Sequence, residues 1–361
     1  MRTRSRRSLI AGAIISAVLA ASLLSSGRVA LGSSALNQRT HAHAHAAAMQ
    51  HVFFILNWLP NVEFAGVWVA QRFGWFKQAG IDMKFESWSP AVHPETDVVS
   101  RGGNSFGFQS GAAIAIAAAQ KVPIVALYTD TQKSVFGLTV LNKSGINKIT
   151  DLRGKRIGYQ SHEIYVPETM LSFAGLKPSD YKLVPVGFDI SGLTAGQVDA
   201  WLTFQTNEPI ALNMQGIGNH SFRAADYGFN FYDDVLLTTR SLVQKNPALV
   251  ATVTKLVARG FKYAHSHPIL AANLTVNNYF HASTAGPGIT AAQNLRQQIL
   301  ELQKFKQFSA DKKGRYTGLM KASVWKASIN TLFKYGEIKR KPSVTAIFTN
   351  TFNPYVNGNY H

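Results

Sequence analysis

Beyond residue 50, the chain repeats one pattern, in which a short β-rich apolar run is followed by a segment whose apolar residues recur every three or four positions. The run HVFFILN at 51–57 predicts a buried strand, residues 64–79 predict a helix, and residues 81–86 alternate as a strand does. Further elements are expected as a strand at 105–108, a helix at 111–120 and a strand at 123–128. Because parallel neighbouring strands need a long crossover, usually a helix, the alternation predicts an α/β fold with largely parallel sheets.

A second set of alternating elements follows, and the chain then becomes mostly helical. Strands are expected at 135–141 and 181–187, a short helix, glycine turn and strand at 151–159, a helix at 165–174, a helix running into a strand at 196–202, and a return through 227–237. The later helices are expected at 246–265, 269–279, 291–302 and 322–335. The length of 361 residues suits two domains or lobes, at about 150 residues each.

The first 36 residues have the three parts of a secretory signal peptide. Arginines crowd the first seven positions, residues 9–24 are apolar or small, and small residues follow at 33–35. The apolar stretch is short for a membrane span, which needs about 20 residues. The SRRSLI sequence at 5–10 also resembles a twin-arginine export signal, so both export routes stay open. We therefore expect an exported protein, periplasmic or on the extracellular face of the cytoplasmic membrane.

Residues 37–50 read as a linker in which His41, His43 and His45 alternate with alanine. Imidazoles bind zinc, copper and nickel. This spacing in a flexible segment gives no fixed coordination geometry, so we expect no metal site there.

The charge balance is strongly basic, with a formal net charge of +18. Six of the 37 basic residues are arginines within residues 1–50, which leaves 31 basic against 19 acidic residues for the rest. These charges are scattered and are not interleaved with aromatic residues as a nucleic-acid platform would need. We therefore expect no nucleic-acid partner.

The chain has no cysteine, which excludes disulfides, thiol nucleophiles and a lipid anchor on an N-terminal cysteine.

A series of short motifs resembles one protein family from about residue 51 to residue 350. The order and spacing of the motifs carry the resemblance, since no single fragment is decisive. The motifs are NWLPN at 57–61, FAG at 64–66, GWF at 74–76, GID at 80–82, GF at 107–108, PIV at 123–125, DLRGK at 151–155, AGL at 174–176, GQVDA at 196–200, TNEP at 206–209 and NP at 246–247. The chain is similar to the thiamine-pyrimidine-synthase-like (SsuA/THI5-like) substrate-binding proteins of ABC importers, a family with a eukaryotic enzyme branch.

The resemblance implies a type II periplasmic-binding-protein fold, with two α/β lobes and a ligand cleft at the hinge. The lobes would comprise 51–134 (lobe 1), 135–234 (lobe 2) and 235–361 (return to lobe 1). It also implies a small-molecule ligand, an ABC permease and an ATPase as partners, and a monomeric receptor with no cofactor and no metal. Hinge closure would trap the ligand.

Aromatic and polar side chains near the predicted strand ends are the candidate cleft residues. Flat ligands need aromatic faces and a few placed polar groups, and α/β sheets bind ligands at the carboxyl ends of their strands. The candidates are Trp58, Asn61, Trp88, Gln109, Ser110, Tyr159, His162, Glu163, Asn207, Glu208 and Tyr227. Each has a structural alternative, which is core packing for Trp58, hinge packing for Tyr227, and turn shaping, helix capping or a solvated turn for the polar ones.

The enzyme branch of the family implies two catalytic devices that this sequence lacks. Gln109 stands at the position of the lysine that holds pyridoxal phosphate, and Ala113 at that of the substrate histidine. An amide cannot form a Schiff base. The stretch GFNFY at 228–232 replaces a cysteine-rich iron motif. We therefore expect no enzyme.

A secreted hydrolase is the alternative of another class, and it would need a Ser-His pair or shifted carboxylates in the cleft. No Gly-x-Ser-x-Gly motif is present. His265 and His267 have no acidic neighbour in the sequence, and we expect both to face solvent.

The expected ligand is a small aromatic N-heterocycle, a thiamine pyrimidine precursor first and riboflavin next. Glu163 is the expected acceptor for an amino group. FAG at 64–66 replaces the histidine common in pyrimidine receptors and looks more like the riboflavin type. A nitrate, sulfonate or taurine receptor is the alternative and would need an Arg or Lys in the cleft.

Overall fold

The computed structural model describes residues 49–86, 89, 91–160, 163–187, 189–280 and 289–358. The predicted signal peptide and nearly all of the linker lie outside the described residues, as do Trp88 and His162. In the part that is described, no helix is both long enough and apolar enough to cross a bilayer.

The first sheet has the strand order β2-β1-β3-β10-β4. Strand β1 runs parallel to β2 and β3, whereas β10 is antiparallel to both β3 and β4. The strands are β1 (Gln50–Ile55), β2 (Ile81–Glu86), β3 (Ser105–Gln109), β4 (Ile124–Thr129) and β10 (Val235–Thr239). The second sheet repeats the scheme with the order β7-β6-β8-β5-β9, in which β5 is the antiparallel strand. Its strands are β5 (Phe136–Leu141), β6 (Arg156–Gln160), β7 (Lys182–Val186), β8 (Ala200–Phe204) and β9 (Asn219–Arg223). The predicted α/β class is confirmed, whereas both sheets are mixed, because β10 and β5 each pair antiparallel with two neighbours.

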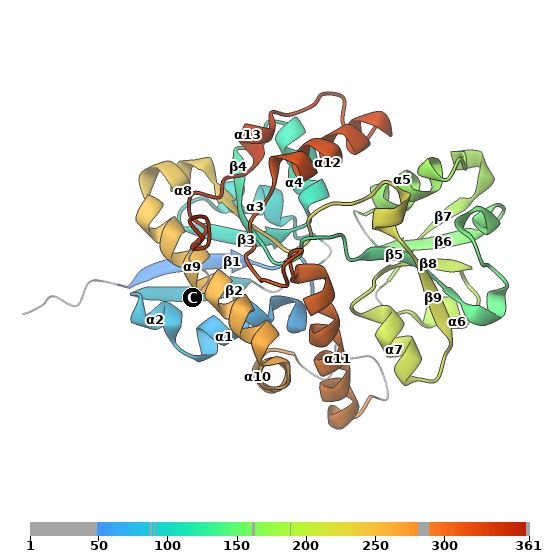
Figure 1. Cartoon of the computed structure of the whole chain (residues 1–361), viewed down its shortest axis with the longest axis horizontal. Coiled ribbons are helices and arrows are strands. Elements are labelled where there is room, and N and C mark those ends of the chain that lie inside the picture. Colours follow the sequence, from blue (N-terminus) through green and yellow to red (C-terminus); the bar gives the residue numbers. More distant parts are fainter. Residues whose placement is uncertain are drawn as a thin grey trace, which may run out of the picture. The chain divides into compact units, whose positions relative to one another are not determined.

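Helices cover both faces of the first sheet (Figure 1). Helices α1, α2, α9 and α10 pack together on one face, and α3, α4, α12 and α13 on the other. The helices are α1 (Ala65–Arg72), α2 (Trp75–Gln78), α3 (Pro94–Arg101), α4 (Gly111–Ala119), α5 (Tyr165–Phe173), α6 (Ser191–Thr194), α7 (Glu208–Met214), α8 (Arg240–Lys245), α9 (Pro247–Ser266), α10 (Pro268–Asn278), α11 (Ala291–Ser309), α12 (Ala322–Lys334) and α13 (Val344–Ile347). The 3₁₀ turns are η1 (Val62–Phe64), η2 (Asn142–Ser144), η3 (Ile149–Leu152), η4 (Pro178–Asp180) and η5 (Ala224–Tyr227).

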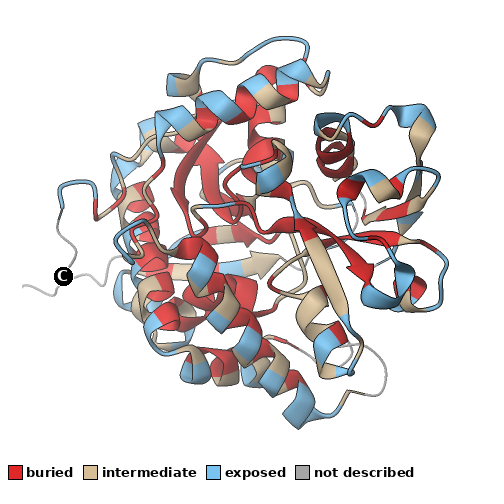
Figure 2. Cartoon of the chain, turned by 45° about the vertical axis from the view of Figure 1, so that its right-hand side comes forward, coloured by how far each residue is buried: buried red, intermediate tan, exposed pale blue. Residues whose placement is uncertain are grey.

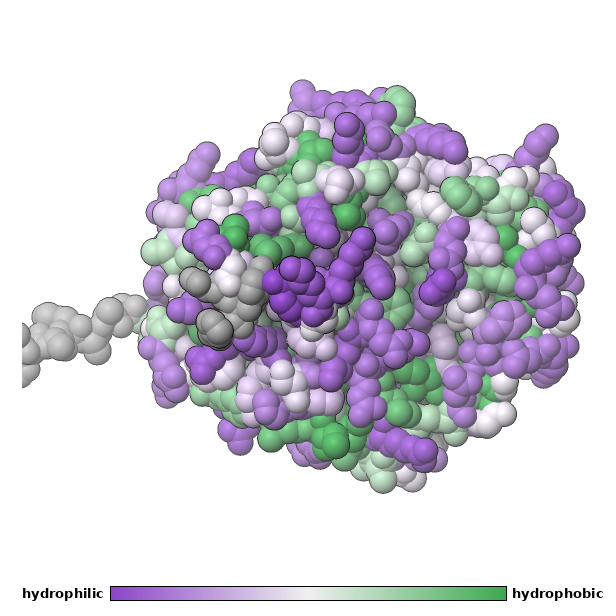
Figure 3. All heavy atoms as spheres, viewed as in Figure 1, coloured by the Kyte–Doolittle hydropathy of each residue, from purple (hydrophilic) through white to green (hydrophobic). Residues whose placement is uncertain are grey.

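Burial follows this layering. The strands at the centre of each sheet are buried and the outer helix faces are exposed, as Figure 2 shows. Hydrophilic side chains cover most of the face seen in Figure 3, with apolar side chains in separate patches.

Two local predictions were wrong, and one helix was missed. The helix predicted at 64–79 is divided into α1 and α2, because Gly74 adopts a left-handed φ of 69°. The helix predicted to start at 196 is instead a turn, with Gly196 at φ 72°, that leads into β8. Helix α3 was missed because its exposed face is polar, although Pro94 at its first turn is a helix-start signal.

Helices α1 and α9 approach each other through a pair of glycines. A Cβ added to Gly260 would lie 2.7 Å from the carbonyl carbon of Gly66, and closer still to its oxygen. A Cβ added to Gly66 would overlap Phe261. The buried packing of these two helices in the first core therefore depends on the missing side chains.

Two chain segments connect the sheets, at 130–135 and 228–234, and they are hydrogen-bonded to each other. The backbone oxygen of Asp233 accepts hydrogen bonds from Thr129 Oγ1 at 2.9 Å and Thr131 Oγ1 at 2.7 Å. The Asp130 N–H donates to the backbone oxygen of Asp234 at 3.1 Å. Asp234 is buried with a left-handed φ of 51°. These paired segments lie where the resemblance places the hinge, and we keep the predicted lobe boundaries as a proposal.

The prediction that His265 faces solvent without an acidic partner was wrong. His265 is fully buried, and its Nε2 lies 2.9 Å from Oδ1 of Asp130. Ser309 on α11 donates to Oδ2 of the same carboxylate at 2.9 Å. The first connecting segment is thus anchored to α9 and α11, a long-range contact that no sequence spacing could reveal.

Candidate functional site

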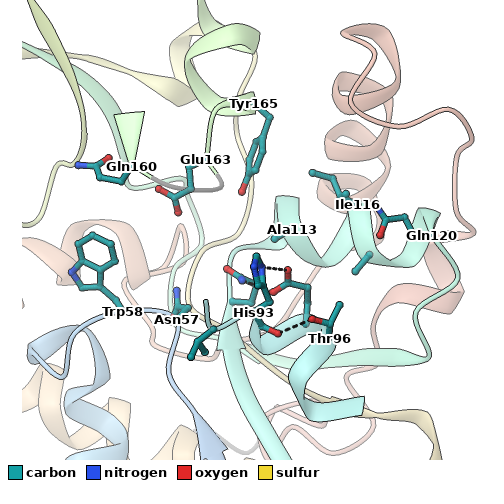
Figure 4. Close-up of a pocket in the computed structure, with 14 residues that line it drawn as sticks. Asn57, Trp58, His93, Thr96, Ala113, Ile116, Gln120, Gln160, Glu163 and Tyr165 are labelled. Atoms are coloured by element: carbon teal, nitrogen blue, oxygen red, sulfur yellow. Dashed lines mark hydrogen bonds and ion pairs between the residues drawn. The ribbon is translucent and has the colours of Figure 1, made fainter. Parts of the chain in front are cut away.

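A cavity of about 230 Å³ lies between elements of the two sheets. Its walls combine aromatic, small apolar and polar side chains. In Figure 4, Asn57 and Glu163 point toward each other across the cavity, beside Trp58. The lining residues are Asn57, Trp58, Val92, His93, Glu95, Thr96, Gln109, Ala113, Ile116, Ala117, Gln120, Gln160, Glu163 and Tyr165.

A second, narrow cavity of about 20 Å³ shares one wall with the first. The two have Asn57, Trp58, Gln160 and Glu163 in common. The rings of Phe136 and Phe204 meet edge to face in its wall, with centroids 4.7 Å apart. The second cavity adds Phe136, Leu202, Thr203, Phe204, Asn207 and Glu208.

Strand ends position most of these side chains. Asn57 and Trp58 follow β1, Gln109 ends β3, Gln160 ends β6, and Asn207 with Glu208 follows β8. These are carboxyl ends of parallel strands, where open α/β sheets bind ligands.

Gln109 is held at the cavity wall by hydrogen bonds at both ends of its amide. Its Nε2 donates to Oε2 of Glu95 at 2.6 Å, and its Oε1 accepts the N–H of Ser110 at 2.8 Å. Ser110 accepts the N–H of Ala113 as the cap of α4 and lies 3.2 Å from the hydroxyl of Tyr165. Ser110 therefore caps a helix and also links α4 to α5, although it does not line either cavity.

Two carboxyl groups at the site have raised pKa values. Burial raises the pKa of Glu208 to about 7, against hydrogen bonds such as that from the Phe204 N–H to Oε2 at 2.9 Å. Burial also raises the pKa of Glu163 well above its usual range, and the nearby carboxyls of Asp233 and Glu63 add to the effect. No Lys or Arg lines either cavity among the described residues. Such a site suits a ligand that presents hydrogen-bond donors or positive charge.

The predicted site residues divide into two groups. The cavities include Trp58, Gln109, Glu163, Asn207 and Glu208. Four others line neither cavity and have structural roles, namely Asn61, Ser110, Tyr159 and Tyr227. Asn61 caps η1 by accepting the Glu63 N–H at 2.9 Å, and its backbone oxygen accepts Trp68 Nε1 at 2.8 Å. Trp88 and His162 lie outside the described residues.

Sequence reasoning missed several lining residues. Gln160 could have been found from its place at the end of a predicted strand. Glu95 and His93 could not have been found, because Glu95 lies in helix α3 and His93 directly precedes it, and this helix was not predicted. Phe136 and Phe204 come from the antiparallel strand β5 and its neighbour β8, and only the pairing of these strands shows that the two rings meet.

The sequence profile of the family described as NMT1/THI5 like matches residues 61–271. The chain belongs to the NMT1/THI5-like family. A relative in sequence is the riboflavin-binding protein RibY of Chloroflexus aurantiacus, 23% identical over 85% of this chain and 87% of that protein. The formylaminopyrimidine-binding protein of Halalkalibacterium halodurans is 23% identical over 68% of this chain and 76% of that protein. A third relative, of Legionella pneumophila, is named 4-amino-5-hydroxymethyl-2-methylpyrimidine phosphate synthase; it is 25% identical over 62% of this chain and 72% of that protein.

Solved structures confirm the fold. The putative periplasmic sulfonate-binding protein SsuA of Methylobacillus flagellatus matches with a TM-score of 0.60 and 16% identity, over 84% of this chain and 93% of that one. The aliphatic sulphonate-binding protein SsuA of Escherichia coli gives a TM-score of 0.58 at 15% identity, over 82% of this chain and 91% of that one. The chain therefore has the periplasmic-binding-protein fold, and family and fold together support a substrate-binding protein.

The residues present do not fit the chemistry that the synthase branch implies. Gln109 and Ala113, which the resemblance places at the positions of the branch's lysine and histidine, both line the cavity. The Gln109 amide has no amine with which to hold pyridoxal phosphate. Among the described residues, no group of three His, Cys, Asp or Glu side chains is placed to bind a metal.

The buried Asp130, His265 and Ser309 cluster does not supply a hydrolase triad either. Ser309 donates to the aspartate rather than to the histidine, so the serine–histidine contact of a triad is not present in this cluster.

Proposed function

We propose that this protein is the extracytoplasmic substrate-binding protein of an ABC importer and binds a small, amino-substituted aromatic N-heterocycle without covalent chemistry. The observation that carries the proposal is the composition of the cavity walls. Aromatic faces at Trp58, Phe136 and Phe204 stand beside the carboxyl groups of Glu163 and Glu208. Rings stack on aromatic faces, and ring amino groups donate to carboxyl oxygens.

The same walls disfavour the anion alternative. In the described lining, a sulfonate or nitrate would lie beside the carboxyls of Glu163 and Glu208 and beside no Lys or Arg. Anion sites in proteins usually offer guanidinium or ammonium donors. The fold likeness to sulfonate-binding proteins therefore does not extend to the proposed ligand.

A thiamine pyrimidine precursor is our first candidate, because its amino group matches Glu163 and a relative is named as a formylaminopyrimidine-binding protein. Riboflavin is the second candidate. The larger cavity continues along α4 past Ala113, Ala117 and Gln120, which leaves room for a longer molecule. RibY also matches over more of this chain than the other relatives described above.

The test is a thermal-shift screen of the purified protein against aminopyrimidines, thiamine, riboflavin, taurine and nitrate. A micromolar ligand at millimolar concentration stabilises the folded state by about 4 kcal/mol. We expect a shift with a heterocycle and none with taurine or nitrate. A shift with the anions alone would refute the proposal.

Two tryptophan variants then test the site. Trp58→Ala removes a stacking face and should weaken binding about 5- to 150-fold, since stacking on an aromatic side chain contributes about 1–3 kcal/mol. Trp75→Ala is the matched control, because Trp75 is also half-buried against the first core but lines neither cavity. Equal affinity losses in the two variants would remove Trp58 from the binding site.

The proposal includes export and delivery. The signal-like N-terminus and the receptor fold support a periplasmic or cell-surface location. The closed receptor would dock on a permease, which would transport the ligand across the membrane with energy from ATP hydrolysis.

A further inference from the structure

Helix α11 carries a buried hydrogen-bond network that reaches both sides of the site. The Glu301 carboxyl accepts Nε2 of Gln297 at 2.8 Å and Nε2 of Gln298 at 3.0 Å. Gln298 Oε1 in turn accepts the backbone N–H of Val62 at 3.0 Å. Gln297 Nε2 also lies 3.5 Å from Oδ1 of Asn207. The network thus joins η1, beside the first sheet, to the start of α7, beside the second. We refer to it below as the α11 network.

Each end of the α11 network lies next to another buried carboxyl. Glu63 follows Val62 and is 2% exposed, Glu208 follows Asn207 and is 8% exposed, and Glu301 itself is 1% exposed. The charges that act on Glu301 are those of Glu208 and Glu63, and Glu63 acts on Glu208 in the same way. Carboxyls from beside both sheets therefore meet here, and the neighbouring charges that raise their pKa values belong to other carboxyls.

The surrounding elements add further acids. Asp233 and Asp234 lie on the second connecting segment, Asp130 with its partner His265 on the first, Glu163 and Tyr165 at the start of α5, and His93 and Glu95 at α3. The carboxyl of Asp234 lies against that of Glu63, and within the described chain neither of its oxygens has a hydrogen-bond partner of good geometry. Asp234 also has the left-handed backbone described above. The acids thus gather where the two connecting segments meet.

We propose that closing the two lobes takes up protons, and that Glu63, Glu208 and Glu301 hold them in the closed form. Bringing carboxylates together away from water is costly, whereas protonated carboxyls are neutral and can donate hydrogen bonds. Opening would part Glu208 from Glu63 and Glu301 and admit water to all three. The proposal rests on the proposed function only in assuming that the lobes open and close.

The direction of the pH effect follows from the raised pKa values. Burial raises the pKa of Glu63 and of Glu208 to about 7, and that of Glu301 to about 8. Hydrated carboxyls in an open form would titrate near their ordinary pKa of about 4.3. Between these values the closed form binds more protons, so a falling pH favours closure and a rising pH favours opening.

The test measures the distance between the lobes without any ligand. Because the chain has no cysteine, Ser179→Cys in the second-sheet part and Lys326→Cys in α12 give two unique spin-label positions. Pulsed electron–electron double resonance then gives the populations of short and long distances between pH 5.5 and 8.5. We expect the ratio of closed to open protein to rise about tenfold or more as the pH falls.

Glu301→Gln and Glu63→Gln, each made in the labelled protein, should flatten this pH dependence while keeping the closed form accessible. Asp226→Asn is the matched control, since Asp226 is exposed and paired with Arg223 at the surface. Thermal unfolding shows whether each variant is folded, and either buried variant alone suffices. A pH-independent distance, or a dependence that both buried variants retain, would overturn the proposal. Neither result bears on which heterocycle binds, so the two proposals fail separately.

Discussion

Replacing Gly260 by alanine should destabilise the protein, against what helix propensity alone predicts. Alanine is favoured over glycine inside a helix by about 1 kcal/mol. At this position, however, the added Cβ would lie 2.7 Å from the carbonyl carbon of Gly66, where ordinary contacts begin at about 3.4 Å. The neighbour is backbone, so no side-chain rotation relieves the overlap, and α1 and α9 must separate.

The magnitude follows from the balance of these two effects. Overpacking a core costs about 1–3 kcal/mol, and a rigid backbone neighbour favours the upper end of that range. After the gain in helix propensity, we expect a net loss of about 2 kcal/mol in the free energy of unfolding. Val253, Val257 and Phe261, which are buried on the same helix, would lose contacts with α1.

Urea unfolding followed by circular dichroism measures this loss. The matched control is Lys255→Ala, an exposed position on α9 at which alanine meets no close neighbour and should be neutral within about 0.5 kcal/mol. A Gly260→Ala variant whose free energy of unfolding equals or exceeds that of the parent protein would show that α1 and α9 can separate without loss of stability. The reasoning from the glycine contact would then be wrong.

Three further predictions concern buried and strained positions. Removing the imidazole in His265→Ala should cost about 3–5 kcal/mol by urea unfolding, because it leaves the Asp130 carboxylate buried without its histidine partner. Burial raises the pKa of Asp233 to about 7, so ionisation of this buried carboxyl lowers the stability of the folded protein as the pH rises toward 8. Asp233→Asn should therefore reduce the fall in the free energy of unfolding between pH 5 and 8. An unchanged dependence of that free energy on pH would contradict this prediction. Gly74→Ala should lower stability by about 1 kcal/mol, since φ is 69° there and no close atom is in the way; an unchanged melting temperature would count against a strained φ.

Much of the fold could be predicted from the sequence because its elements have local signals. Strand β2 was predicted with both of its ends correct from its alternating apolar and polar residues, and α4 was predicted to within one residue from its alanine-rich apolar run. Helix α3 could not be predicted from apolar periodicity, because its exposed face is polar and few of its residues are buried.

The site was predictable in part, and for a physical reason. Side chains that follow parallel strands, such as Trp58, Gln109 and Glu208, come together wherever the strands share a sheet. Asn61 also follows a strand, but its side chain caps η1 instead of lining a cavity. Nothing in the local sequence distinguishes these two roles. The pairing of His265 with Asp130 joins positions far apart in the chain, and only the packing of α9 reveals it.

The burial of acidic side chains changes the charge of the protein's exterior. Six of the 19 acidic residues are buried, and Glu95 and Glu163 line the cavity, so eleven acids remain for the exterior. All 31 basic residues beyond residue 50 keep some exposure, since none is among the buried side chains. The exterior is therefore more cationic than the composition indicates. A cationic exterior attracts anionic surfaces, and this attraction weakens as the salt concentration rises.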